Sequence, residues 1–175
     1  TASQRKMLSD VLKKQNTEGG LVQKSVELIG AENTFTITTG HQLNLMGSPL
    51  YSIYKICQVI GLARELNESQ DQYNYVPLFW MATEDHDFEE INHIHLFGQT
   101  LSWDVESNNK ITGEIPIQQI EDFLDQVEGK FNDPVQLQIV QELTSIYRHS
   151  ETLSEAHAKI IKLLFKDTEL LVLDA

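Results

Sequence analysis

Hydrophobic and polar positions along the chain form two kinds of pattern, stripes with helical spacing and short continuous apolar runs. Glycine pairs and polar clusters separate these segments and mark the turns between them. In chain order, the first half is predicted to form helices at about 2–16 and 21–29, a strand at 34–39, a helix from Pro49 to about Leu66, and a strand at 75–82.

The second of these strands is the most informative. Residues 75–81 are apolar or aromatic without the alternation of a half-exposed strand, which is typical of a strand buried on both faces. A strand, a helix and a further strand in sequence favour parallel pairing through a right-handed crossover. The pattern therefore predicts an α/β fold, a Rossmann-like parallel sheet with helices on both faces.

The second half of the chain has shorter elements, which predict a small antiparallel β insertion. We expect strands at 93–97 and 101–105, a third at 111–117, a helix ending near Gly129, a helical region at about 134–166, and a last core strand at 170–174. We interpret residues 1–175 as the N-terminal part of one core domain, with about 93–130 as an inserted connecting segment. The apolar run near Ala175 suggests a core truncated before its remaining strands.

Charge and composition restrict the function. The net charge of -13 and the absence of a basic stripe exclude a nucleic-acid binder, and no apolar stretch is long enough to span a membrane. Cys57, the single cysteine, lies in an apolar helical stripe, so we expect a buried structural thiol in a cytoplasmic protein.

Ionisable residues follow the buried strand directly, at Glu84, Asp85, His86 and Asp87. Ligands of open α/β sheets bind beyond the carboxyl ends of the strands, so this cluster is a candidate site. A histidine between two carboxylates suits general acid–base chemistry. Two alternatives stay open: Asp87 could cap the turn at 88–91, or the acids could ligate a metal together with His93 and His95.

The loop after the first strand is a second candidate site. It contains Gly40 and Gly47 and leads into a helix N-terminus, where backbone N–H groups favour anions. Tyr51, Tyr54 and Lys55 follow in the first turns of that helix. The spacing matches neither a dinucleotide fingerprint nor a P-loop, so a plain strand–helix turn is the alternative.

Two motifs together resemble a known family. Thr38-Thr39-Gly40-His41-Gln42 with Gly47-x-Pro49-Leu50-Tyr51-x-Ile53-Tyr54-Lys55, followed by residues 77–92 (PLFWMATEDHDFEEIN), is similar to the bacillithiol biosynthesis cysteine-adding enzymes. The family pattern carries glutamine where this chain has His41. The resemblance covers the whole chain but only about the first third of the family's length.

This resemblance implies a Rossmann-like core and a dimerising coiled coil elsewhere in the polypeptide. The implied reaction joins cysteine to glucosaminyl malate, with ATP as the expected cosubstrate and Mg²⁺ as its expected companion. It assigns acid–base roles to Asp85, His86 and Asp87. Binding of substrate or nucleotide is expected at Thr39, Gly40, His41, Gln42, Gly47, Tyr51, Tyr54, Lys55, Glu84, Glu90, Asn92 and Asp174.

Two other functions compete with the ligase interpretation. One is a metal-dependent hydrolase built on residues 84–87, and the other is a nucleotide-binding module without catalysis. Because the core is expected to continue beyond this segment, we expect the isolated 175 residues to lack ligase activity and to bind nucleotide weakly at best.

Overall fold

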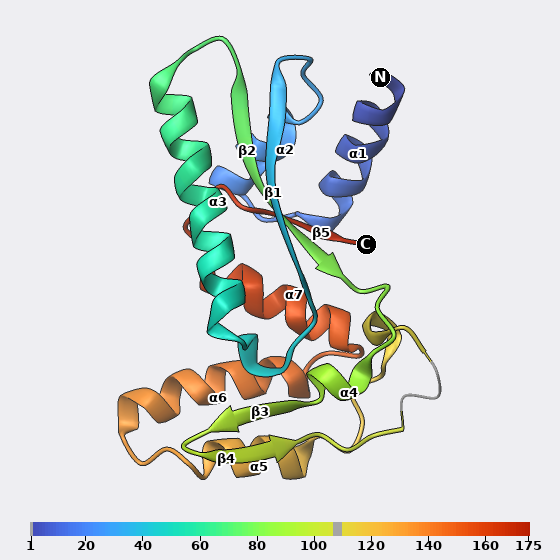
Figure 1. Cartoon of the computed structure of the whole chain (residues 1–175), viewed down its shortest axis with the longest axis vertical. Helices are drawn as coiled ribbons and strands as arrows, with labels where there is room; N and C mark the ends of the chain where they lie inside the picture. Colours follow the sequence, from blue (N-terminus) through green and yellow to red (C-terminus); the bar gives the residue numbers. More distant parts are fainter. Residues whose placement is uncertain (1, 107–109) are drawn as a thin grey trace. The chain divides into compact units, whose positions relative to one another are not determined.

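The computed structural model describes residues 2–106 and 110–175, which form helices, strands and two short 3₁₀ turns (Figure 1). In chain order the elements are α1 (Ala2–Gln15), α2 (Leu21–Leu28), β1 (Thr34–Gln42), η1 (Leu45–Gly47), α3 (Leu50–Ser69), β2 (Asn74–Ala82), α4 (Phe88–Ile91), β3 (His93–Leu96), β4 (Gln99–Ser102), η2 (Thr112–Glu114), α5 (Glu121–Glu128), α6 (Pro134–Arg148), α7 (Leu153–Leu164) and β5 (Leu171–Asp174). None of the helices in these described segments is both long enough and apolar enough to cross a bilayer.

The described chain divides into two compact units. The first contains residues up to 41, residues 50–81 and residues 162–175, and the second contains residues 42–49 and the described part of 82–161. A three-stranded parallel sheet of order β1-β2-β5 organises the first unit. In β5, Leu171 lies opposite Leu78 of β2 and Asp174 lies opposite Met81. The predicted Rossmann-like sheet is confirmed.

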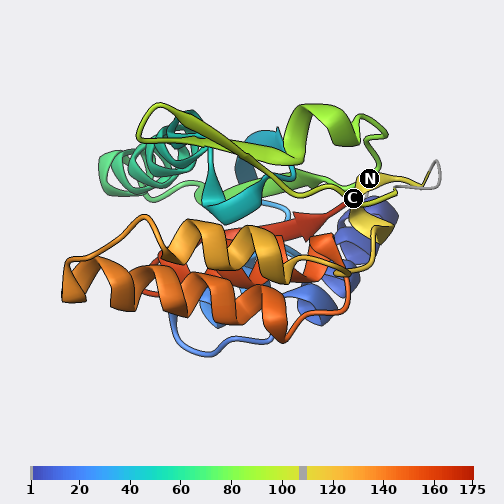
Figure 2. The ribbon, with the colours of Figure 1, turned by 90° about the horizontal axis from the view of Figure 1, so that it is seen from below.

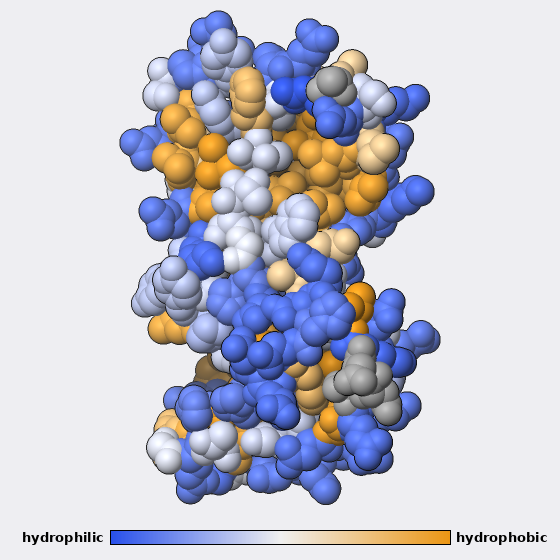
Figure 3. Space-filling view, turned by 45° about the vertical axis from the view of Figure 1, so that its right-hand side comes forward, coloured by the Kyte–Doolittle hydropathy of each residue, from blue (hydrophilic) through white to orange (hydrophobic). Residues whose placement is uncertain are grey.

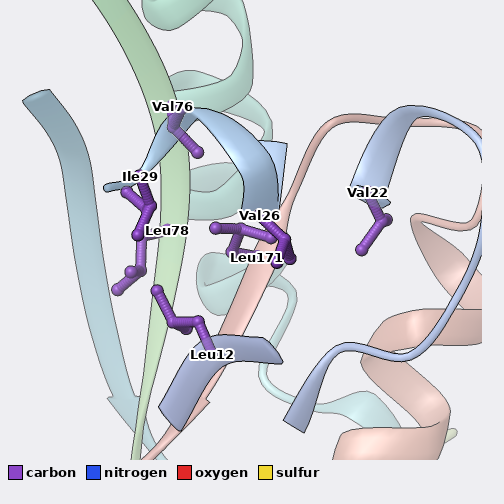
Figure 4. Packing of buried hydrophobic residues seen from close by; sticks show 7 residues of the cluster. All are labelled: Leu12, Val22, Val26, Ile29, Val76, Leu78 and Leu171. Atoms are coloured by element: carbon purple, nitrogen blue, oxygen red, sulfur yellow. The ribbon is translucent and has the colours of Figure 1, made fainter. Parts of the chain in front are cut away.

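Helices cover both faces of this sheet. On one face, residues of α1 and α2 pack against β2 and β5 in a buried cluster (Figure 4). The labelled members of this cluster are Leu12, Val22, Val26, Ile29, Val76, Leu78 and Leu171. Because strand side chains alternate, Phe79 and Met81 face the opposite side, where α3 runs, and both are buried.

Side chains at the end of α1 close the outer edge of β5. The Asn16 amide donates to the Val172 carbonyl at 2.8 Å and accepts from the Val172 N–H at 2.9 Å. Gln15 repeats this pair of hydrogen bonds with Asp174, at 3.1 and 3.0 Å. The two amides thus satisfy the backbone groups that a neighbouring strand would otherwise pair.

The second unit contains the β3–β4 hairpin and the helices α5 and α6, which run side by side (Figure 2). The hairpin pairs His93 with Ser102 and Leu96 with Gln99, so the predicted antiparallel insertion is confirmed. Arg148 of α6 holds α5 through Glu121, Asp125 and Glu128, at N–O distances of 2.8–3.1 Å.

Several local predictions are wrong. The third strand predicted at 111–117 does not form. Residues 112–114 are the 3₁₀ turn η2, because the N–H groups of Thr112 and Gly113 donate to Asp85 and Thr83, and Pro116 makes only an isolated antiparallel bridge with Thr152. The segment at 40–42 belongs to β1 and not to a loop. The strand predicted at 101–105 overlaps β4 (Gln99–Ser102) only at Leu101 and Ser102, since the hairpin turns at Phe97-Gly98.

Two burial predictions also fail. Cys57 is exposed, because the buried stripe of α3 runs through Ile56, Val59, Ile60 and Ala63 and leaves position 57 on the outer side. Trp80 is 42% exposed, so β2 is not buried on both faces along its whole length.

Candidate active site at the end of β2

The turn after β2 is held in place by the 3₁₀ turn η2. Gly113 donates from its N–H to the Thr83 carbonyl at 3.0 Å, and Thr112 donates to the Asp85 carbonyl at 2.7 Å. A Cβ at position 113 would lie 2.7 Å from the Thr83 Cβ, so only glycine permits this approach. Two segments about 30 residues apart in sequence therefore fix the backbone from which the acidic side chains project.

The acidic turn is a set of linked hydrogen bonds. Asp85 accepts from the Asp87 N–H at 3.0 Å through one carboxylate oxygen. Its other oxygen accepts from the Gln42 amide at 2.7 Å, and the same amide nitrogen reaches Glu90 at 3.1 Å. Asp87 caps α4 by accepting from the Glu90 N–H, as the capping hypothesis predicted. Gln42 therefore connects two carboxylates that lie on either side of Asp87 in sequence.

These contacts set the charge of Asp85. The backbone hydrogen bond from Asp87 and the amide of Gln42 together lower the pKa of Asp85 below its ordinary value. Asp85 is therefore ionised at neutral pH, and it lies directly before His86 in the chain. The His86, Asp87 and Glu84 side chains are exposed to solvent.

An open pocket of about 1230 Å³ lies beside this turn, within the second unit. Asp85, His86, Asp87 and Asn92 line it, together with Phe88 and Glu89. The lining also includes residues farther along the chain that the sequence did not identify as site residues, namely Asp104, Val105, Glu106, Gln118 and Gln119. Carboxylates predominate among the charged side chains of the lining, which favours a cationic ligand group.

An aromatic pair supports the wall of this pocket. The rings of Phe88 and Trp103 meet edge to face at 5.5 Å, and the Trp103 indole N–H donates to the Gln118 carbonyl at 2.8 Å. Asn92 accepts from the Trp103 N–H at 2.7 Å through its own carbonyl. Gln119 has a positive φ of 53°, an uncommon conformation for this residue type. The sequence signal for this wall is weak: two acids near a tryptophan and a Gln-Gln pair before a helix.

Most residues of the second candidate site, the segment that follows the first predicted strand, belong to the first unit. There the Lys55 ammonium donates to the Gly40 carbonyl, and it lies 5.4 Å from the centre of the Tyr51 ring. Tyr51 and Tyr54 are both exposed. Gly40 faces Trp80: a Cβ there would be 3.4 Å from the Trp80 Cβ and carbonyl oxygen, so the glycine accommodates the neighbouring strand.

The structure therefore divides the predicted site residues between its two units. Thr39, Gly40, His41, Tyr51, Tyr54, Lys55 and Asp174 lie in the first, and Gln42, Gly47, Glu84, Asp85, His86, Asp87, Glu90 and Asn92 lie in the second. Within the second unit, Gln42, Asp85, Asp87 and Glu90 are brought together by direct hydrogen bonds. Gly47 adopts a positive φ of 70° in the turn before α3, a conformation that favours glycine.

The metal alternative receives no geometric support in the described segments. Among residues 2–106 and 110–175, no three histidine, cysteine or acidic side chains converge in an arrangement that could hold a metal ion. His93 and His95 instead pack ring against ring at 5.2 Å, and they hydrogen-bond to Asn92 and Thr100.

The middle strand of the parallel Rossmann-like sheet is followed by an acidic, histidine-containing turn, and an open pocket lies beside this turn. These features are typical of α/β domains that bind small molecules beyond the ends of their strands. Within this class, the chain belongs to the family described as "Bacillithiol biosynthesis BshC, N-terminal Rossmann-like domain", whose model matches residues 1–175.

Curated relatives agree with this assignment. Proteins named "Putative cysteine ligase BshC" from Flavobacterium psychrophilum and Flavobacterium johnsoniae are 41% and 40% identical over 97% and 96% of this chain. One of the same name from Bacillus cytotoxicus is 30% identical over 93% of it. The chain spans about one third of the length of these relatives, 33%, 32% and 31% respectively.

Proposed function

We propose that this chain forms part of a cysteine ligase of bacillithiol biosynthesis, which joins the carboxylate of cysteine to the amine of glucosaminyl malate. Membership of the family and the name of its curated relatives support the reaction class. The carboxylate-lined pocket at the end of β2 is the observation that carries the assignment of substrate to site.

The chemistry of the pocket suits an amine. A sugar amine is largely protonated near neutral pH, and ionised Asp85 with its acidic neighbours would attract that cation. The bound ammonium must lose one proton to become a nucleophile, and that proton can pass to solvent through the open pocket. The nitrogen loses a second proton as it forms the amide bond. His86 lies between Asp85 and Asp87 in the same turn and is the group we assign to accept this second proton.

ATP is the proposed cosubstrate, because a carboxylate does not form an amide without activation. The acidic pocket by itself does not fit a triphosphate, since its carboxylates would repel phosphate oxygens. The ammonium group of Lys55 suits the phosphates of ATP better. Tyr51 and Tyr54 are exposed and lie close to Lys55 in sequence, so they offer an aromatic surface for the nucleotide. A divalent cation such as Mg²⁺ would accompany the nucleotide. Dimerisation of the full polypeptide and a cytoplasmic location belong to the same proposal.

An assay of product formation tests this function. The longer polypeptide should be incubated with cysteine, glucosaminyl malate and ATP, and the product should be measured by mass spectrometry. We expect a new species whose mass equals the sum of the two substrates less one water. Omission of cysteine, and replacement of glucosaminyl malate by its N-acetylated form, are the controls, because acetylation removes the nucleophilic amine.

Other results would point to the competing functions. Hydrolysis of an amide that depends on added metal and is abolished by chelation would indicate a hydrolase. Binding of ATP without any amide product would indicate a nucleotide-binding module. Either result would reject the ligase assignment.

A further inference from the structure

The segment between β1 and α3 is anchored to two helices of the second unit. Met46 donates from its N–H to the Tyr147 hydroxyl of α6 at 2.8 Å. Nδ1 of His157, on α7, lies 3.2 Å from the Asn44 carbonyl oxygen and 3.4 Å from the Asn44 nitrogen, so it bonds to one or the other according to its tautomer. The conformation of residues 44–46 therefore depends on side chains 101 and 113 residues farther along the chain.

Tyr147 occupies a position where a hydroxyl group is unfavourable unless it has a hydrogen-bond partner. The face of the second unit that Figure 3 shows is mainly hydrophilic, whereas Leu43, Leu45 and Tyr147 are fully buried beneath its surface. Phenylalanine would fill nearly the same space without placing a polar atom there. The structure gives the hydroxyl a definite role, because it accepts the Met46 N–H.

Met46 needs this support because its backbone is left-handed. Its φ of 56° and ψ of 27° are a conformation that residues other than glycine seldom adopt. A strained conformation persists where the surrounding contacts stabilise it. The Tyr147 hydroxyl supplies such a contact at the N–H of the strained residue itself. We therefore expect residues 44–46 to relax when that hydroxyl is removed.

The same segment is connected to the acidic turn through Gln42. The Asn44 side-chain amide donates to the Gln42 carbonyl at 2.9 Å and thereby supports the Gln42 backbone. The Gln42 side-chain amide donates in turn to Asp85 at 2.7 Å and to Glu90 at 3.1 Å. Hydrogen bonds weaken steeply when their geometry is disturbed. A shift of residues 44–46 would therefore weaken the donor that the two carboxylates share.

We propose that Tyr147 is a positioning residue for the candidate active site, because it holds residues 44–46 in the conformation that places Gln42. Gln42 in turn brings its shared amide donor to Asp85 and Glu90. Tyr147 is not among the described residues that line the pocket. Burial raises the pKa of Tyr147 above its ordinary value, so its hydroxyl stays protonated and acts as a fixed contact. The effect on Asp85 is independent of the proposed function, whereas an effect on ligase turnover rests on it.

A double-mutant cycle between Tyr147 and Gln42 tests this role. Tyr147→Phe removes the hydroxyl and keeps the ring, and it should raise the pKa of Asp85 by roughly half or more of the rise that Gln42→Leu causes, as measured by carboxyl ¹³C NMR of this chain. In the Gln42→Leu background, Tyr147→Phe should cause no further rise, because it acts on Asp85 through Gln42.

Thr144→Val is the matched control for this cycle. It also removes a fully buried hydroxyl from α6, but that hydroxyl donates to Glu128 of α5. The substitution should therefore leave the pKa of Asp85 unchanged, even where it lowers the stability of the unit. A rise of that pKa in Thr144→Val as large as in Tyr147→Phe would show a general loosening of α6 and would overturn the proposal.

Asn44→Ala breaks a second link of the same path and serves where Tyr147→Phe does not fold. It removes the donor to the Gln42 carbonyl, so it should also raise the pKa of Asp85 and should have no further effect in the Gln42→Leu background. An unchanged pKa of Asp85 in either Tyr147→Phe or Asn44→Ala would overturn the proposal. Full additivity of either substitution with Gln42→Leu would do the same.

Turnover separates this inference from the proposed function. In the longer polypeptide, Tyr147→Phe should lower kcat/KM for amide formation by about tenfold, because the carboxylates of the acidic turn are displaced and not removed. A raised pKa of Asp85 in a polypeptide that makes no amide would support the positioning role of Tyr147 and reject the ligase. An unchanged pKa of Asp85 in a variant of an active ligase would reject the positioning role alone.

Discussion

At the scale of single residues, Gln42 has the most consequential position in the second unit. Its amide nitrogen donates to both Asp85 and Glu90, at 2.7 and 3.1 Å, and thereby lets two carboxylates share one donor. The sequence motif identified Gln42 as a candidate site residue but could not distinguish a ligand contact from this positioning contact. The structure shows the positioning contact.

Replacing Gln42 by leucine should raise the pKa of Asp85. The variant loses a hydrogen bond to the ionised carboxylate, and Glu90 stays close without its shared donor. Carboxyl ¹³C NMR titration measures this shift directly. Gln23→Leu is the control, because Gln23 bonds to Glu27 on the surface of α2, far in sequence from Asp85. An unchanged pKa in the Gln42 variant would show that the backbone N–H of Asp87 alone controls Asp85.

The same shift makes an acid-dependent contribution to stability. Because the folded-state pKa of Asp85 is lowered, its stabilising effect is fully present above the unfolded-state pKa of about 4 and is lost as pH falls through the folded-state value. The stability difference between wild type and Gln42→Leu should therefore be largest near neutral pH and shrink below about pH 4. Urea unfolding at several pH values measures it.

His86 and Asp87 provide the test of catalysis at this scale. If the proposed ligase function holds and the pair manages the amine proton, His86→Ala or Asp87→Asn in the full-length polypeptide should lower turnover by roughly 10²–10⁴-fold. Circular dichroism should show that the fold is retained, since both side chains are exposed. Glu68→Gln, on the exposed side of α3, is the control. Turnover close to wild type in both variants would leave Asp87 with only its capping role.

At the scale of elements, the approach of η2 to the end of β2 decides where the acidic turn lies. Gly113→Ala should destabilise the protein by about 1–3 kcal/mol, because the new methyl group would lie 2.7 Å from the Thr83 Cβ and force the two segments apart. Thermal or urea unfolding measures this change.

Gly61→Ala is a matched control for that substitution. Gly61 lies within α3, and a Cβ there meets nothing within 4 Å. Alanine at this position should be neutral or stabilising by about 0.5–1 kcal/mol through helix propensity. Equal effects of the two substitutions would mean that η2 moves freely to accommodate the methyl group.

The pairing of α5 with α6 depends on Arg148. Its guanidinium bonds Glu121, Asp125 and Glu128, and Thr144 also donates to Glu128 at 2.6 Å. Arg148→Met should lower the unfolding free energy by about 1–2 kcal/mol while keeping the aliphatic packing. The hydroxyl of Thr144 and the guanidinium of Arg148 lower the pKa of Glu128, so this stabilisation should also fade in acid. A loss that is the same at pH 7 and pH 3 would indicate that packing, and not charge, is responsible.

At the scale of the whole molecule, the sheet is held together by contacts between the two ends of the described chain. Asn16→Leu should reduce stability by about 2–4 kcal/mol, because it leaves the N–H and C=O of Val172 buried without partners. Asn16→Asp should be nearly as damaging, since its carboxylate would face the Val172 carbonyl oxygen. Gln15→Ala should cost less, because Gln15 is only partly buried. An unfolding free energy for Asn16→Leu within about 0.5 kcal/mol of the wild-type value, measured by denaturant titration, would contradict this account.

The sequence predicted the parts of the fold that depend on local patterns. The apolar runs at 75–82 and 170–174 and the stripe of α3 predicted the parallel sheet and its crossover, because such runs are buried wherever the strand lies. Gly40 was interpreted as a loop residue because glycine usually breaks strands, whereas here it accommodates Trp80 across the sheet. Whether Gly40 lies in a strand or in a loop depends on the Trp80 side chain, 40 residues away, and a local sequence pattern does not contain that information.

The candidate site divides in the same way. Asp85, His86 and Asp87 could be identified from their place after a buried strand. Asp104, Glu106, Gln118 and Gln119 could not, because only the docking of η2 and the Trp103 indole brings them to the pocket. The resemblance to a known family identified the two sequence motifs, but it did not identify these four pocket residues.

The closure of β5 by Gln15 and Asn16 has a consequence for biosynthesis of the protein. The hydrogen bonds of these two side chains reach 159 and 156 residues along the chain. At ribosomal rates of about 5–20 residues per second, α1 is complete roughly 10–30 s before its partners in β5 have been made. During that interval the two amides can bond only to water or to transient partners, so this edge of the sheet stays unclosed until β5 has been made. The sheet therefore acquires its final boundary as one of the last events in the production of this segment.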